Sequence, residues 1–265
     1  MPRTKNMLLP TLRKNTQRPI DAACDGLKLS VRDLTVGYGT DHIMQGVSFG
    51  VRAGEILVIL GKSGIGKTTL LNAISGLMAT EEGSVSVNGR LAYVMQKDLL
   101  LPWRTSLKNV LLPIEIMGGD VRAAQTNARC LLEQEELGYV AEKYPNELSG
   151  GMRQKVSFIR MQASDSDIAL LDEPFSALDY VARLRHVKKL RDWAINNRKA
   201  VIYVTHDLDE AIGLADKLLV LGGSPGRIVL ETEVDLREEQ RDPVTLRETK
   251  EFQTIFSLIW RILKS

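Results

Sequence analysis

Four short and almost wholly apolar runs recur along the chain, each of the length of a buried β-strand. They cover residues 55–60, 168–172, 200–205 and 217–221. Strands that are apolar on both faces are typical of parallel sheets with both sides covered. Segments with helical character lie between the first run and the others, at 67–77, 121–136 and 151–163. Strands that alternate with helices predict right-handed crossovers and a mainly parallel sheet in an α/β fold.

Two stretches depart from this rhythm. Residues 27–36 alternate loosely, as an edge or antiparallel strand would. Residues 97–165 lack a strong buried strand and are punctuated by Pro102 and Pro113. We therefore expect an antiparallel β edge before the parallel core and an α-helical subdomain, about 97–165, inserted into it.

The two ends of the chain differ from the middle. Residues 1–26 carry five basic and two acidic side chains with little periodicity, so we expect a flexible N-terminal arm. A C-terminal extension, 223–265, ends in an amphipathic helix. Its apolar stripe is Leu246, Phe252, Ile255, Phe256, Ile259 and Leu263. Such a stripe most often packs on its own domain; a dimer or regulatory contact and a membrane-surface helix are the alternatives.

Composition narrows the class of protein. The chain has 265 residues, 44% of them apolar, and a formal charge of +2, which gives no electrostatic case for nucleic acid. Cys24 and Cys130 fit neither a metal spacing nor a disulfide framework, so they are interpreted as free thiols in a reducing compartment. The apolar runs are far shorter than the ~20 residues of a membrane span. With no signal-peptide plan at its start, the chain is expected in the cytoplasm.

The stretch "GKSGIGKTT" at 61–69 follows a buried strand and opens a helix. It fits the phosphate-loop pattern G-x-x-x-x-G-K-[ST], in which glycines let backbone N–H groups point inward at phosphate. Lys67 would bridge the outer phosphates and the Thr68 hydroxyl would ligate Mg²⁺. The alternative is an ordinary Gly-rich turn, but the pattern arises by chance in only about 1% of chains this long. The expected nucleotide-binding residues are Gly61, Lys62, Ser63, Gly64, Gly66, Lys67, Thr68 and Thr69.

Polar residues stand at the ends of three further apolar runs. Asp172 and Glu173 close the run at 168–172, while His206 and Gln96 each follow directly on another. Ligands of open parallel sheets bind beyond the carboxyl ends of the strands, so we expect one site here. Asp172 suits a hydrated Mg²⁺ ion, and Glu173 is placed to orient or deprotonate an attacking water. Taken singly, such residues are more often strand ends that meet solvent.

Two more segments point to a nucleotide. Tyr38 lies between two glycines, 23 residues before Gly61, where its ring could stack on adenine; a partly buried turn tyrosine is the alternative. In "SGGMRQK" at 149–155, Ser149 can cap a helix whose first turn holds bare N–H groups and no acidic residue. That helix start is an anion site, and these residues alone do not reveal its ligand.

Together these residues resemble the nucleotide-binding subunit of an ATP-binding cassette (ABC) transporter, across 27–222. The matching segments are the aromatic loop at Tyr38, the Walker A loop at 61–69, the Gln96 loop, the signature "LSGGMRQK" at 148–155, the Walker B run "IALLDEP", the D-loop "SALD" at 176–179 and the switch histidine His206. The resemblance implies a RecA-like P-loop NTPase fold, ATP and Mg²⁺ as cofactors, and a head-to-tail dimer of two such subunits.

The resemblance also implies roles for individual residues. Glu173 would be the catalytic base, assisted by Lys67 and His206 at the γ-phosphate. Thr68 and Asp172 would lie at the metal, and Gln96, also a catalytic residue, would approach the metal or the attacking water. The residues that would complete the site in a second subunit are Ser149, Gly150 and Gly151, with Asp179 at the dimer interface. Glycine there would let the backbone approach the phosphate.

A finer resemblance concerns the transported solute. Residues 93–110 and "RDP" at 241–243 look like ATPases of nitrate, sulfonate, taurine and pyrimidine-precursor importers. This implies transmembrane permease subunits, an extracytoplasmic solute-binding protein and a place on the cytoplasmic face of the inner membrane. The alternative is a soluble ABC ATPase of DNA repair or translation, but the chain has neither a long coiled-coil insertion nor a second cassette. A phosphate-loop kinase or GTPase would lack the signature.

Overall fold

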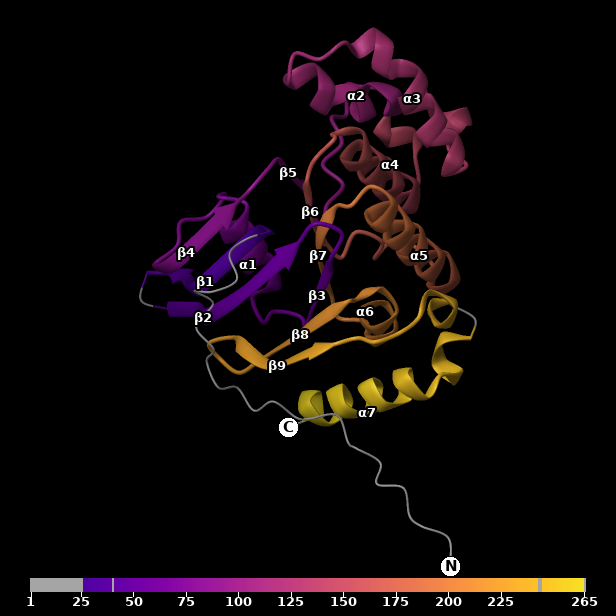
Figure 1. Ribbon diagram of the computed structural model, residues 1–265. Coiled ribbons are helices and arrows are strands. Elements are labelled where there is room, and N and C mark those ends of the chain that lie inside the picture. The colour runs from indigo at the N-terminus through magenta and orange to yellow at the C-terminus, as the bar shows by residue number, and fades with distance from the viewer. Residues whose placement is uncertain (1–25, 40, 243–244, 265) are drawn as a thin grey trace, which may run out of the picture.

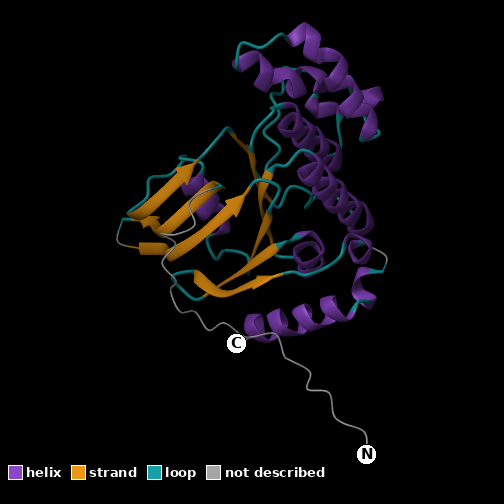
Figure 2. Cartoon of the chain, in the orientation of Figure 1, coloured by secondary structure: helices purple, strands orange, loops and turns teal. Residues whose placement is uncertain are grey.

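The computed structural model of the chain describes residues 26–39, 41–242 and 245–264 (Figure 1). The arm expected over residues 1–26 lies outside these ranges except for its last residue. Figure 2 shows two sheets, a helical group beyond one end of the larger sheet, and a helix beneath it.

A six-stranded sheet forms the centre of the molecule. In sheet order its strands are β5 (Leu91–Val94), β6 (Ile168–Asp172), β7 (Ala200–Thr205), β3 (Ile56–Leu60), β8 (Lys217–Gly222) and β9 (Arg227–Glu233). The first five are parallel, and β9 pairs antiparallel with β8. The four apolar runs are thus four adjacent strands, and the expected mainly parallel sheet is confirmed. The boundary expected at residue 222 falls between two paired strands, β8 and β9.

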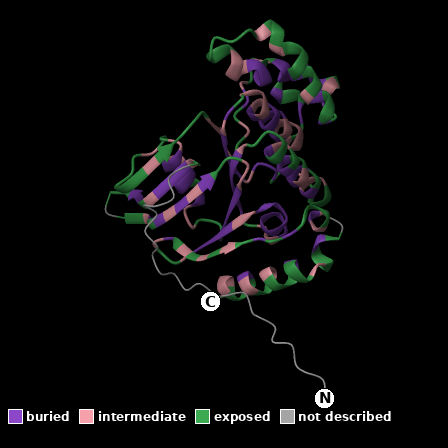
Figure 3. Cartoon of the chain, in the orientation of Figure 1, coloured by how far each residue is buried: buried purple, intermediate pink, exposed green. Residues whose placement is uncertain are grey.

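Both faces of the four strands formed by the apolar runs are buried, as those runs predict (Figure 3). Successive residues of a strand point to opposite faces. In β3, Ile56, Val58 and Leu60 therefore join one hydrophobic core, while Leu57 and Ile59 join another. The first core lies against α5 (Tyr180–Asn196) and α6 (Leu208–Leu214); the second lies against α1 (Lys67–Ile74).

A separate three-stranded antiparallel sheet closes the second core. Its order is β2 (Asp41–Arg52), β1 (Leu27–Tyr38) and β4 (Glu82–Val87). Residues 27–36 are therefore antiparallel, as expected, but they form the middle strand rather than an edge. The alternation of β1 is loose because the pairing with β2 is irregular between Val31 and Leu34, where Asp33 has a φ of 45°. The buried positions therefore change from Leu29 and Val31 to Leu34 and Val36.

Three further helices form a group beyond one end of the large sheet (Figure 1). They are α2 (Ser106–Ile116), α3 (Val121–Gln134) and α4 (Gly150–Ala163), with 3-10 turns at Gly138–Val140 and Pro145–Glu147. These three helices share a core of their own. α4 also contributes Phe158 and Met161 to the first core of the large sheet, so it belongs to both.

The C-terminal stripe packs on its own chain. Two 3-10 turns, Glu238–Arg241 and Leu246–Glu248, precede α7 (Lys250–Lys264), which runs beneath β8 and β9 (Figure 1). Phe252 and Ile259 of α7 are buried in the first core, and Leu246 joins the same core from the turn before the helix. None of the described helices is long and apolar enough to span a membrane.

Candidate active site

The sheet order brings the four predicted strand ends together. β5, β6, β7 and β3 are neighbours. β6 ends at Asp172, β7 and β3 end directly before His206 and Gly61, and β5 ends two residues before Gln96. Parallel strands place their carboxyl ends on one edge of a sheet, so these residues share that edge. The sequence indicated that polar residues stand at these strand ends, and the strand order shows that the ends are neighbours.

The loop at 61–69 wraps around the side chain of Lys67. The Lys67 ammonium is buried and donates hydrogen bonds to the carbonyl oxygens of Gly61 (2.9 Å) and Lys62 (3.1 Å). Gly64 and Gly66 have φ of 80° and 102°, a backbone region that favours glycine. Burial lowers the pKa of Lys67, while the nearby carboxylates of Glu173 and Asp172 oppose that shift. With no acidic residue in the first turn of α1, the loop can hold a phosphate group.

Thr68 and Asp172 form the part of the site that suits a metal ion. The Thr68 hydroxyl donates a 2.6 Å hydrogen bond to Oδ2 of Asp172, which is 2% exposed. Burial raises the pKa of Asp172, and the bond from Thr68 acts against that rise. Among the described residues no cluster of three His, Cys, Asp or Glu side chains could hold a metal alone. A hydroxyl and one carboxylate instead fit Mg²⁺ whose other ligands are water and phosphate oxygens.

Glu173 lies between the His206 imidazole and the Lys67 ammonium. Its Oε1 lies 3.0 Å from Nδ1 of His206 and 3.6 Å from the Lys67 ammonium. Its φ of 46° is left-handed, which is uncommon for a residue with a side chain and costs about 1 kcal/mol or more. The Glu173 N–H donates to the carbonyl of Val204 in β7 and fixes this turn. The carboxylate is thereby held beside the phosphate loop, 3.6 Å from the Lys67 ammonium.

The glycines after Ser149 have different surroundings. Ser149 caps α4 by accepting a hydrogen bond from the Met152 N–H. A Cβ at Gly151 would lie 2.7 Å from Cδ2 of Leu178, whereas a Cβ at Gly150 would have its nearest neighbour 3.6 Å away, at Cβ of Ala177. The sequence suggests only approach to a phosphate as the reason for glycine. At Gly151, close packing against the D-loop of the same chain is a second reason.

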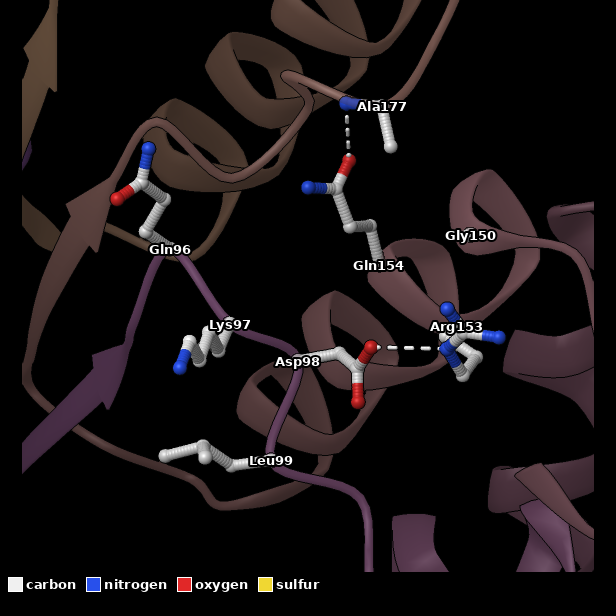
Figure 4. Close-up of a pocket in the computed structure, with 8 residues that line it drawn as sticks. All are labelled: Gln96, Lys97, Asp98, Leu99, Gly150, Arg153, Gln154 and Ala177. Atoms are coloured by element: carbon white, nitrogen blue, oxygen red, sulfur yellow. Dashed lines mark hydrogen bonds and ion pairs between the residues drawn. The ribbon is translucent and has the colours of Figure 1, made fainter. Parts of the chain in front are cut away.

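A pocket of 410 Å³ lies between the Gln96 loop, the start of α4 and the D-loop (Figure 4). Its lining residues are Gln96, Lys97, Asp98, Leu99, Gly150, Arg153, Gln154 and Ala177. The Arg153 side chain binds Asp98 at 3.0 Å, and Gln154 accepts from the Ala177 N–H at 2.9 Å. These two contacts join the signature helix to both loops. Sequence reasoning missed both residues, whose only signal is their place in "SGGMRQK".

Three predicted residues stand in elements other than the phosphate loop. Asp179 caps α5 by accepting from the Ala182 N–H, Tyr38 is 67% exposed at the end of β1, and Ser149 opens α4. Within the described ranges, no hydrogen bond or ion pair joins their side chains to residues 61–69. Figure 1 shows α1 and α4 on opposite sides of the large sheet. One chain thus gathers Lys67, Thr68, Asp172, Glu173 and His206 and keeps the signature separate.

Comparison with known proteins gives consistent matches. The family model for ABC transporters matches residues 44–176. The chain is 40% identical to the aliphatic sulfonates import ATP-binding protein SsuB of Mycobacterium sp. (strain MCS), over 78% of this chain and 84% of the relative. It is 37% identical to the taurine import ATP-binding protein TauB of Rhizobium johnstonii, over 86% of this chain and 92% of the relative.

Solved structures agree with these sequence matches. An ATP-binding subunit of an ABC transporter superposes with a TM-score of 0.71 at 25% identity, covering 86% of this chain and 99% of that one. A dimeric ATP-binding cassette in a post-hydrolysis state, bound to ADP and Pi, gives a TM-score of 0.67 at 27% identity, covering 79% of this chain and all of the other.

Proposed function

Because the chain belongs to the ABC transporter family, we propose that it is the ATP-hydrolysing subunit of an importer for small sulfonate-like solutes. The observation that carries the proposal is the cluster at the ends of β3, β6 and β7, where Glu173 Oε1 lies 3.0 Å from His206 and 3.6 Å from Lys67. Import of sulfonates or taurine is a property of the relatives, and it supports the same solute class here.

The chemistry is assigned to five side chains. Lys67 binds the outer phosphates of ATP, and Thr68 and Asp172 hold the Mg²⁺ that accompanies them. Bound Mg²⁺ would neutralise charge on the phosphate oxygens. Glu173 accepts the proton of the attacking water, and His206 holds Glu173 and the γ-phosphate in position. Gln96 joins this set from the neighbouring strand end, beside the metal.

The site is completed by a second subunit. Ser149 and the backbone of Gly150 and Gly151 would bind the γ-phosphate held by the partner's loop, with Asp179 at the interface. The placement of α4 and α1 on opposite sides of the large sheet supports this arrangement, because it keeps the signature apart from the phosphate loop of the same chain. The structure of a dimeric cassette with ADP and Pi supports dimerisation. Either an identical chain or a close relative can provide the second subunit.

Membrane partners dock near the Gln96 loop in this proposal. Trp103 is 72% exposed and Leu99 is 52% exposed, and both follow Gln96 closely in the chain. These two side chains are available for contact with an apolar partner surface. Transmembrane permease subunits would contact them on the cytoplasmic face of the membrane, with an extracytoplasmic solute-binding protein on the other side. The relatives are import proteins and give the soluble repair or translation class no support.

The test is growth of cells that lack this chain, with taurine or an alkanesulfonate as the sole sulfur source. We expect the wild-type chain to restore growth and Glu173→Gln, made in equal amount, to fail. Sulfate as the sulfur source is the control on which all strains should grow. Normal growth on sulfonate by cells that lack the chain would contradict the assigned solute class. A purified chain that does not hydrolyse MgATP would contradict the assigned ATPase activity.

A further inference from the structure

The C-terminal extension reaches two segments of the proposed ATP site through Arg247. The Arg247 guanidinium binds the Asp209 carboxylate with two hydrogen bonds, one of them 3.0 Å from Nε to Oδ1. It also lies 5.5 Å from the centroid of the Tyr180 ring, and the Tyr180 hydroxyl donates to the same carboxylate at 3.0 Å. A two-pronged arginine–carboxylate pair fixes orientation as well as distance.

The two partners of Arg247 stand next to residues with proposed roles in hydrolysis. Tyr180 follows Asp179 of the D-loop and is the first residue of α5. Asp209 lies three positions after His206, in the first turn of α6. Arg247 therefore bridges the segment that carries the dimer-interface aspartate and the segment that carries the switch histidine.

Arg247 stands on a segment that is itself anchored to α6. Its neighbour Leu246 is 3% exposed in the first core. Arg241, buried in the same extension, donates to the carbonyl oxygens of Gly213 and Ala215 at the far end of α6. The extension thus contacts α6 at both ends. The backbone that carries Arg247 is therefore held in place against α6.

α5 and α6 are also joined by ion pairs that do not involve Arg247. Arg183 of α5 already binds Asp207 at 3.1 Å and Glu210 at 2.8 Å, joining α5 to α6 from the inside. The Arg247 side chain is 62% exposed, and its removal leaves Asp209 with the Tyr180 hydroxyl. Loss of Arg247 should therefore change how α5 and α6 are set relative to each other more than it changes stability.

We propose that Arg247 is a positioning residue for ATP hydrolysis, which sets the D-loop and the switch histidine relative to each other through Tyr180 and Asp209. The C-terminal extension thereby becomes part of the hydrolytic apparatus without touching the nucleotide. This inference rests on the proposed ATPase function and on the roles proposed for Asp179 and His206.

The experiment measures steady-state hydrolysis of MgATP by the full chain carrying Arg247→Ala. We expect kcat to fall about three- to tenfold, the size of typical coupling between residues in contact, with KM for ATP within twofold of wild type. Arg247→Lys keeps the positive charge but cannot form the two-pronged pair with Asp209, so its kcat should lie between those of Arg247→Ala and wild type. The melting temperature of all variants should stay close to that of wild type.

Two further variants distinguish this role of Arg247 from a general effect of losing a surface arginine. Arg261→Ala removes an exposed arginine from the same extension and should leave kcat unchanged. Adding Asp209→Asn to Arg247→Ala should cost nothing beyond the worse single variant, because both act through one contact. Additive losses, or a kcat of Arg247→Ala equal to wild type, would overturn the inference while wild-type hydrolysis left the proposed function intact. Absence of hydrolysis in the wild-type chain would instead defeat the function on which it rests.

Discussion

The Thr68 hydroxyl donates a 2.6 Å hydrogen bond to Asp172, a residue 104 positions further along the chain. This bond joins the phosphate loop to the end of β6 and places a hydroxyl and a carboxylate where Mg²⁺ would bind. The pairing forms because β3 and β6 end on the same edge of the sheet, separated only by β7.

Removing that hydroxyl should weaken the use of Mg²⁺. Thr68→Val keeps the branched shape but loses a ligand and leaves the buried Asp172 carboxylate without its donor. We expect the rate of MgATP hydrolysis to fall at least about tenfold. The Mg²⁺ concentration that gives half of the maximal rate should rise. Thr68→Ser, which keeps the hydroxyl, is the matched control. An unchanged Mg²⁺ dependence in Thr68→Val would contradict the metal assignment.

Glu173→Gln should separate ATP binding from hydrolysis. Glutamine keeps the size and tolerates the backbone about as well, but it cannot accept a proton from water. We expect phosphate release to fall by at least about a hundredfold, within the range of general base catalysis, while MgATP binding persists. Size-exclusion chromatography with MgATP should show the variant accumulating as a dimer. Phosphate release at the wild-type rate would exclude Glu173 as the base.

The two signature glycines allow a test of the site across the dimer. Gly150→Ala has room in its own chain and adds helix propensity, so the free chain should be unchanged or up to about 1 kcal/mol more stable. The new methyl group should nevertheless hinder ATP-dependent dimerisation, measured by light scattering. In Gly151→Ala the close approach to Leu178 should cancel the gain in stability. A Gly150→Ala chain that dimerises normally would speak against phosphate contact at this backbone.

A buried contact between α3 and α5 should make stability depend on pH. Burial alone would raise the pKa of Glu135, but the contacts from His186 and Lys189, with Nδ1 of His186 3.2 Å away, lower it below its ordinary value of 4.5. A carboxyl with a depressed pKa stabilises the fold above its unfolded pKa and loses that contribution as pH falls through the folded value.

Glu135→Gln should therefore reduce the free energy of unfolding by about 1–3 kcal/mol at pH 7, and by progressively less as pH drops below 4.5. Urea denaturation across this pH range measures the difference, with the exposed Glu133→Gln as control. A difference between wild type and Glu135→Gln that stays constant down to pH 3 would show that the charge plays no part.

The strand ends were predictable because each combines a buried apolar run with a polar residue at its close. Asp172, His206 and Gly61 could be grouped on that basis alone. The order of the strands in the sheet could not be predicted, because apolar runs of similar length and composition do not indicate which strands pair with one another. The middle place of β1 was missed for the same reason: pairing on both sides depends on β4, whose sequence "EGSVSV" is mostly exposed.

Contacts between distant side chains were beyond sequence reasoning. Nothing in the pattern around Arg247 indicates a partner at Asp209, since both lie among many charged residues on helical segments. Gln154 and Arg153 were visible only as members of a motif. Their ties to Ala177 and Asp98 depend on how α4 sits between two loops, which only the folded chain determines.

Because α4 packs in two hydrophobic cores, it couples the stability of the helical group to that of the large sheet. Val156 and Ile159 lie in the core of the helical group, and Phe158 and Met161 lie in the core beneath the large sheet. Melting either core would leave half of α4 without its apolar partners. The helical group and the sheet should therefore unfold together as one cooperative unit. The amide hydrogens of residues 156–161, beyond the bare first turn of α4, should exchange only through that global opening.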